Sequence, residues 1–357
     1  MRPLPMASEP ALADTLPAPP PRRFTPARAA AILALLAALL AATVAAALTL
    51  GSTSAGLREL LFPDSAQAVS RAILLEVRLP RILLAAAVGA CLSAAGVCFQ
   101  AVLRNPLADP YILGVSGGAG LGSILASAAA PAAGLAVTTV RPAAAFGGAL
   151  AAVAALLAMS RGRGRVLPET MILLGVVMNA TIMAAIMFIV TMADFSRYAG
   201  TMYWLIGNLA SPSGGELALV YGCLIPGLIA LTIMGQPLNV LAGGEELAGQ
   251  LGLDAPRIRV AALGAGSLVT AAAVSLSGLV GFVGLVVPHA GRVLLGPDNR
   301  LLLPASALLG GAVLVAADTA ARALFAPTQI PVGVITALMG GPCFLWLFAR
   351  RAAGRTS

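Results

Sequence analysis

Residues 29–50 read AAAILALLAALLAATVAAALTL, 22 consecutive positions without a charged side chain. A helix of about 20 such residues is long enough to cross the hydrocarbon core of a bilayer. The run is longer than the core of a signal peptide and has no convincing cleavage site, so we predict a retained first transmembrane helix. This stretch indicates that the fold is built from membrane-spanning helices.

The composition extends this prediction to the whole chain. Hydrophobic residues make up 59% of the 357 positions and charged residues only 10%, whereas a soluble domain carries about 25% charged residues. We therefore predict an all-α, polytopic membrane protein with ten transmembrane helices. The nine further spans are expected at 82–103, 111–130, 142–160, 170–193, 217–235, 260–278, 279–296, 301–321 and 330–349, and the cut between the seventh and eighth follows the turn signal Ser277-Gly278.

Two polar tails flank the membrane domain, which we place at 29–350. Residues 1–28 are rich in Pro and Ala and carry four arginines without a periodic apolar pattern, so we predict a disordered tail. Residues 351–357 form a second short tail. Most of the 22 basic residues fall on one side when the amino terminus is placed inside, with Arg161-Gly-Arg-Gly-Arg165 as the strongest anchor. The positive-inside rule then predicts that both tails are cytoplasmic.

The chain lacks lysine, since all 22 basic residues are arginines. A Walker A loop needs a lysine to contact the nucleotide phosphates, so we expect no ATPase site and no catalytic residue here. We predict no metal site. The four cysteines form no CxxC pair, and one histidine, His289, cannot supply the remaining ligands. We interpret the net charge of +8 as arginines that orient the helices in the membrane, and not as a surface that binds nucleic acid.

A polar, glycine-punctuated segment stands out at 236–259, on the predicted cytoplasmic side. Its centre, Gly243-Gly-Glu-Glu-Leu-Ala-Gly-Gln-Leu-Gly252, predicts a short helix with an apolar face and an acidic face. Such a helix would suit docking of a soluble partner. The alternative is an ordinary solvated loop between two spans.

Ionisable groups inside the spans are scarce. Asp318 is the only acid well inside a predicted span, and Arg322 can pair with it one helical turn away. Carriers driven by protons or sodium usually bury such groups along their pathway, so a secondary carrier is disfavoured. The glycines of residues 114–122 lack the strand and lysine of a phosphate loop and predict close helix packing instead.

Several motifs resemble the FecCD-type permeases of ABC importers for iron chelates and cobalamin. They occur in the family's order between about residues 75 and 350. The motifs are Arg78-Leu-Pro-Arg81, Gln100, Arg104-Asn-Pro-Leu-Ala-Asp-Pro-Tyr-Ile-Leu-Gly-Val-Ser-Gly-Gly118, Tyr203-Trp-Leu-Ile-Gly-Asn208, Leu247-Ala-Gly-Gln-Leu-Gly252, Ser277-Gly-Leu-Val-Gly-Phe-Val-Gly-Leu-Val-Val-Pro-His-Ala-Gly-Arg292 and Ile330-Pro-Val-Gly-Val-Ile-Thr-Ala-Leu-Met-Gly-Gly-Pro342.

The resemblance implies a type II ABC importer permease in the inner membrane of a bacterium, paired with a second copy or a close paralogue. It implies two cytoplasmic ATPases, which bind the ATP and Mg, and a periplasmic or lipoprotein substrate-binding protein. The coupling helices would lie within 236–259. The residues implied are Gly243, Gly244, Glu245, Glu246, Leu247, Gln250, Leu251 and Gly252 for ATPase coupling, Arg78, Arg81 and Arg322 for binding-protein docking, and Asn179, Met183, Met187, Thr336 and Met339 for the pathway.

Alternatives stay open for some of these roles. Asn179, Met183 and Met187, which lie four residues apart on one helix face, also fit ordinary helix packing. Arg78 and Arg81 also fit anchoring at the lipid headgroups, and Arg322 also fits pairing with Asp318 alone. Ferric siderophore is our first expectation for the substrate, followed by cobalamin and haem. From a different class, the same features fit a membrane scaffold or sensor subunit that recruits a signalling protein without transporting anything.

Overall fold

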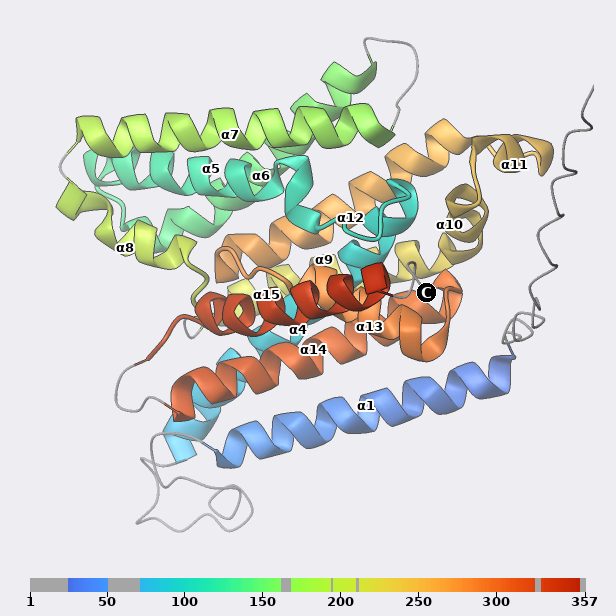
Figure 1. Cartoon of the computed structure of the whole chain (residues 1–357). Coiled ribbons are helices and arrows are strands. Elements are labelled where there is room, and N and C mark those ends of the chain that lie inside the picture. Colours follow the sequence, from blue (N-terminus) through green and yellow to red (C-terminus); the bar gives the residue numbers. More distant parts are fainter. Residues whose placement is uncertain are drawn as a thin grey trace, which may run out of the picture.

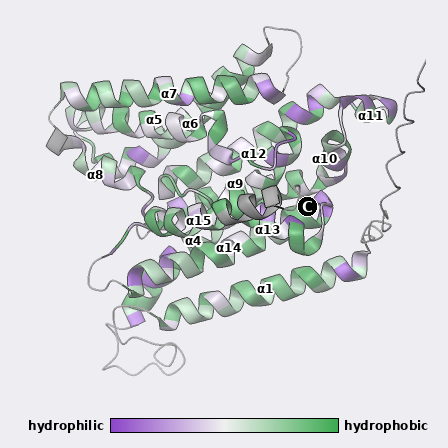
Figure 2. Ribbon diagram, viewed as in Figure 1, coloured by the Kyte–Doolittle hydropathy of each residue, from purple (hydrophilic) through white to green (hydrophobic). Residues whose placement is uncertain are grey.

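A computed structural model describes residues 25–50, 71–161, 168–193, 195–209, 212–324 and 329–353. All regular structure in these ranges is helical, and the long helices lie side by side in one bundle (Figure 1). Apolar residues cover the lengths of the helices, while hydrophilic residues gather at helix ends (Figure 2). The prediction of an all-α, polytopic membrane protein is confirmed.

Each predicted span has a helix in the described ranges. These helices are α1 (Pro26–Thr49), α4 (Leu79–Val102), α5 (Val115–Ala129), α6 (Val137–Arg161), α7 (Pro168–Met192), α9 (Gly214–Ile233), α12 (Ala255–Ser277), α13 (Val283–Leu295), α14 (Asn299–Ala323) and α15 (Val332–Ala353). Seven helices in the described part are long and apolar enough to cross a membrane, and α5, α13 and the apolar part of α15 are shorter. The exact number of spans therefore stays a prediction.

Two boundaries differ from the predicted ones. α1 begins at Pro26 rather than at residue 29, because proline fits the first turn of a helix, where its missing N–H costs nothing. α15 continues to Ala353, beyond the predicted end of the membrane domain. Residues 1–24 and 354–357, and most of the Arg161–Arg165 anchor, lie outside the described residues.

The core lies where α4, α12 and α14 pack together. Most residues of these three helices are buried, and α4 and α14 come closest where Gly89 meets Gly310. A Cβ atom on Gly89 would overlap the carbonyl oxygen of Gly310, so only glycine permits this approach. The same holds for Gly118 of α5 against Gly148 of α6, which confirms the prediction that glycines 114–122 serve helix packing.

The outer helices expose apolar side chains instead. α1 lies along α14 at one side of the bundle (Figure 1), and α7 covers α5 at the other. Leu35 of α1 and Phe188 of α7 are each more than half exposed in this single chain. Apolar surface of this extent is typical of helices that face lipid or another subunit.

The long apolar stretch at 260–296 is interrupted as predicted. α12 ends at Ser277, and Gly278 adopts a φ of +66° that favours glycine. The next helix begins at Val283 rather than at residue 279, because Tyr111 bonds the intervening backbone: its hydroxyl donates to the Val280 carbonyl oxygen (3.0 Å) and accepts from the Val280 N–H (2.9 Å). A non-helical segment inside a bundle needs such partners.

Candidate functional site

The polar segment between α9 and α12 folds into two short helices at one end of the bundle (Figure 1). α10 (Gly235–Ala242) buries Leu238 and Leu241 completely, so this segment is packed against the bundle. After the turn at Gly243 and Gly244, where Gly244 has a φ of +123°, α11 (Glu245–Gln250) follows. The prediction of a glycine-punctuated helix is confirmed, and α10 is an addition to it.

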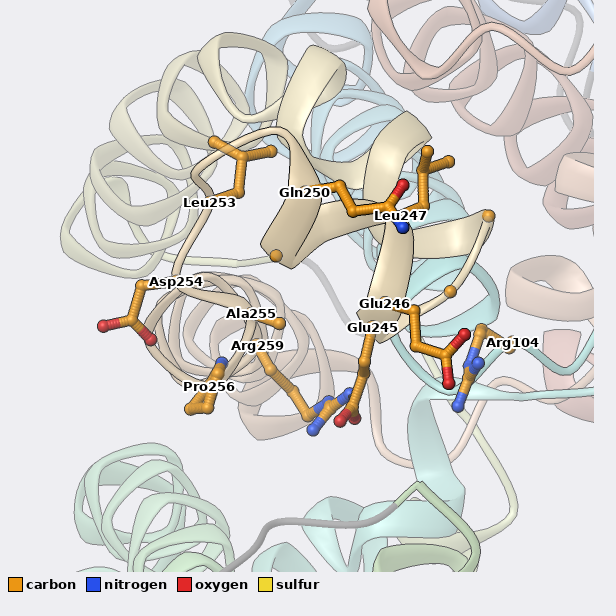
Figure 3. A pocket seen from close by; sticks show the side chains of 13 residues that line it. Arg104, Glu245, Glu246, Leu247, Gln250, Leu253, Asp254, Ala255, Pro256 and Arg259 are labelled. Atoms are coloured by element: carbon orange, nitrogen blue, oxygen red, sulfur yellow. The ribbon is translucent and has the colours of Figure 1, made fainter.

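The exposed side of α11 carries both leucines and polar groups. Ala248 is buried, whereas Leu247 and Leu251 are 43% and 60% exposed, next to the exposed Glu246 and Gln250. Leu247 and Leu251 are four residues apart, as are Glu246 and Gln250, so the apolar and the polar side chains lie on different faces of the helix, and both faces are exposed. α11, the start of α12 and Arg104 border a groove of about 930 Å³ (Figure 3).

The two glutamates of α11 differ in their surroundings. Glu245 forms an ion pair with Arg259 of α12, whose side chain is only 2% exposed. Figure 3 shows Glu245 pointing toward Arg259, while Glu246 points toward Arg104. Glu245 holds α11 on α12, and Glu246 is the more exposed carboxylate; that both act in ATPase coupling stays a prediction. Arg259 was missed because it lies at the edge of a predicted span.

A second polar contact joins α10 to the start of α14. The side-chain Nδ2 of Asn239 donates to Asp298 Oδ1 at 2.8 Å, and its Oδ1 accepts from the backbone N–H of Asn299 at 2.8 Å. The Arg300 guanidinium and the Asn239 amide hold the pKa of the Asp298 carboxyl below its usual range. No sequence pattern pointed to this contact, although Asn239 lies in the segment that we singled out.

The opposite end of the bundle holds a buried charge cluster. Asp318 of α14 accepts from Arg322 at 3.0 Å, which confirms the predicted pair one turn apart. Asp318 also binds Arg81 of α4 at 2.8 Å, and Arg81 donates to Gln329, which precedes α15. Arg78 donates to the carbonyl oxygen of Leu48 at the end of α1. The three arginines predicted for docking are therefore gathered at one end, but they are at most 9% exposed.

The predicted pathway residues lie on α7 and α15, and each of these helices carries both exposed and inward-facing members of the set. Met183 and Met187 of α7 are 46% and 48% exposed, and Met339 of α15 is 66% exposed. Asn179 and Thr336 face inward: Asn179 donates to the carbonyl oxygen of Tyr111 at 2.9 Å, and Thr336 is 6% exposed. Within the described residues, no group of three His, Cys, Asp or Glu side chains is arranged to hold a metal.

Three of the sequence motifs meet at a junction in the bundle. The backbone N–H of Asn208 donates to the Ser277 carbonyl oxygen at the end of α12, and the N–H of Gly333 in α15 donates to the Gly207 carbonyl oxygen. A Cβ atom on Gly333 would overlap the carbonyl oxygen of Ile206, so this approach requires glycine. The motifs thus fix how α12, α15 and the chain after α8 (Phe195–Leu205) meet.

A bundle of long apolar helices with two short helices at one end agrees with the permease motifs of the sequence. The chain belongs to the FecCD transport family, whose model matches residues 32–350. It is therefore a permease subunit of an ABC importer, as the motifs predicted.

Similar proteins agree with this assignment. The chain is 44% identical over 289 residues to the cobalamin import system permease protein BtuC of Halobacterium salinarum, covering 81% of this chain and 75% of that protein. It is 36% identical over 318 residues to the hemin transport system permease protein HmuU of Yersinia pestis, covering 87% and 94%. A solved structure of a metal-chelate type ABC transporter in an inward-facing conformation matches with a TM-score of 0.78 at 28% identity, covering 90% of this chain and 99% of that one.

Proposed function

We propose that this chain imports a metal chelate of the cobalamin, haem and ferric siderophore class, and that a separate ATPase docking on α10 and α11 drives it. The observation that carries the proposal is the folded α10–α11 unit, which presents Leu247, Leu251 and Glu246 on one exposed surface. The relatives named for cobalamin and hemin support the substrate class. The chain itself carries no ATPase site in this proposal, since it has no lysine for a Walker A loop.

In this proposal the ATPase acts on the bundle through α10 and α11. ATP binding closes two ATPase subunits and moves α10 and α11, which rocks the bundle between outward-open and inward-open states. A second copy or a paralogue completes the pathway, and the exposed apolar faces of α7 and α15 suit such an interface. The α10–α11 end would face the cytoplasm with both termini, and a binding protein would dock at the opposite end.

The docking role of Arg78, Arg81 and Arg322 is restricted by their burial. Arg81 and Arg322 share Asp318, and Arg78 donates to the carbonyl oxygen of Leu48. A contact with an acidic side chain of a binding protein would suit these guanidinium groups, because opposite charges guide and orient docking. Arg78→Gln is the cleaner test, because it leaves the Asp318 pairs intact. We expect weaker binding with a smaller salt dependence in titrations of the binding protein against the complex at two ionic strengths; unchanged binding would assign the arginines to structure alone.

The ATPase surface is tested by reversing one charge. Glu246→Arg leaves the Glu245–Arg259 pair intact, so it changes the surface without loosening α11. We expect it to weaken assembly with the ATPase or to uncouple hydrolysis from uptake. Glu169→Arg, at an exposed carboxylate in the first turn of α7, is the matched control. Equal behaviour of the two variants would argue against docking on α11.

The substrate is tested by uptake into vesicles that contain the assembled complex. Radiolabelled cyanocobalamin, hemin and a ferric siderophore are offered with the binding protein, with and without ATP inside. We expect ATP-dependent uptake of one of them. A complex that assembles and takes up none of the three would favour the scaffold or sensor alternative.

A further inference from the structure

The side chain of Asn239 joins α10 to α14 with both of its polar atoms. Its Nδ2 donates to Asp298, the residue that caps α14, and its Oδ1 accepts from the first backbone N–H of that helix. Two hydrogen bonds from one amide fix both the distance and the rotation of α10 against α14. Asn299 is only 1% exposed, so the second bond lies inside the protein.

The backbone packing supports the same connection. Gly235 at the start of α10 lies so close to Arg300 that an added Cβ would stand 2.9 Å from the Arg300 Cα. Leu238 and Leu241 of α10 are fully buried. α10 packs against both α4 and α14, and Asn239 and Gly235 hold it on the first turn of α14. α11 differs, because the turn at Gly243 and Gly244 separates it from α10 and Glu245 binds it to α12.

α14 then extends from this unit to the opposite end of the bundle. It is fixed to α4 in its middle, where Gly310 meets Gly89, and near its end, where Asp318 binds Arg81. Closely packed elements move as rigid bodies, because their interfaces do not deform continuously. A displacement at the start of α14 is therefore carried to the region of Arg81.

We infer that Asn239 is a positioning residue for coupled transport: it makes α14 follow α10, so that ATPase-driven movement reaches the opposite end of the bundle. The inference rests on the proposed docking of an ATPase on α10 and α11. The two short helices then move different long helices: α10 moves α14 through Asn239, and α11 moves α12 through the Glu245–Arg259 pair.

Exchanging the two polar partners tests the inference in the assembled complex. Asn239→Asp places a carboxylate against Asp298 and breaks the contact, whereas the double variant Asn239→Asp with Asp298→Asn restores a donor facing an acceptor. We expect the single variant to lower chelate uptake per ATP hydrolysed roughly tenfold and the double variant to recover most of the loss. Uptake is measured with cyanocobalamin, hemin and the ferric siderophore. Arg257→Gln, at an exposed side chain nearby, is the control.

A second measurement does not depend on the substrate. Leu324, at the end of α14, is 73% exposed, and a cysteine there reports the movement of α14 by its rate of maleimide labelling, with Cys223 and Cys343 replaced by serine. We expect ATP to change this rate in the wild type and the double variant but not in Asn239→Asp. An ATP response without uptake of any chelate would refute the proposed substrate class and support the inference. Wild-type coupling and labelling in Asn239→Asp, or a double variant no better than the single one, would overturn the inference.

Discussion

The two ends of α14 hold their aspartates in opposite ways. Asp318, near the last turn, is 1% exposed and bound by two guanidinium groups, one from α4 and one from its own helix. Asp298, at the first turn, is 28% exposed and bound by the neutral amide of Asn239 and by its neighbour Arg300. A buried charge tolerates no loss of its partners, whereas solvent replaces a lost partner at the surface. The fold therefore depends strongly on the partners of Asp318, whereas the contacts of Asp298 contribute little to the free energy of unfolding.

The largest effect is expected from removing the charge of Asp318. Asp318→Asn keeps the shape of the side chain but leaves Arg81 and Arg322 buried without their shared carboxylate. We expect a loss of about 3–5 kcal/mol in the free energy of unfolding, because an uncompensated buried charge is costly. Thermal unfolding in detergent measures it.

A triple variant checks the reason for that loss. In Asp318→Leu with Arg81→Met and Arg322→Met, no buried charge is left unpaired, so much of the stability should return. A stable Asp318→Asn protein would mean that water reaches this cluster and that the contrast between the two ends is wrong.

A smaller effect is expected in the middle of α14. Gly310→Ala places a methyl group against Gly89 and Ser93 of α4, where the backbone cannot yield. We expect a loss of about 1–3 kcal/mol by overpacking. Gly264→Ala in α12 is the control, since a Cβ there meets no atom within 4 Å, and alanine should stabilise that helix by about 0.5–1 kcal/mol. Equal results for the two variants would show that α4 and α14 are not closely fixed.

The contribution of Asp298 to stability should depend weakly on pH. The pKa of Asp298 is lowered in the folded chain, chiefly by its bond with Arg300. Asp298 therefore stabilises the fold above its ordinary pKa of about 3.9, and this stabilisation is lost as pH falls through the lower folded value. We expect wild type to exceed Asp298→Asn by less than about 1 kcal/mol at neutral pH, and the difference to vanish in acid. A difference that stays constant with pH would exclude the charge as its cause.

The smallest effect is expected at a surface pair at the start of α12, beside α11. Arg257 and Asp254 lie 2.8 Å apart, but the arginine side chain is 87% exposed. Arg257→Gln keeps Asp254 as the cap of α12 and should cost no more than about 0.5 kcal/mol. Unfolding at low and high salt measures this, and a loss above about 1 kcal/mol would show that surface charge is not screened at this end.

Hydropathy and local spacing allowed most of the architecture to be predicted. Charge-free runs located the helices, Ser277-Gly278 marked the break before α13, and the four-residue spacing of Asp318 and Arg322 predicted their pair. Glycines around Gly243 and Gly252 located the short helix between α9 and α12. These features are local, because helix geometry alone relates residues within one or two turns.

The contacts between helices were decided by the tertiary structure. Arg81 reaches Asp318 across 237 residues of sequence, Asn239 meets Asp298, and Glu245 turns inward to Arg259 while Glu246 stays exposed. Which side of a helix faces which neighbour depends on its rotation and height in the bundle, and packing sets both. In helices that are apolar on every side, a sequence determines that they span the membrane, but it does not show which face is buried.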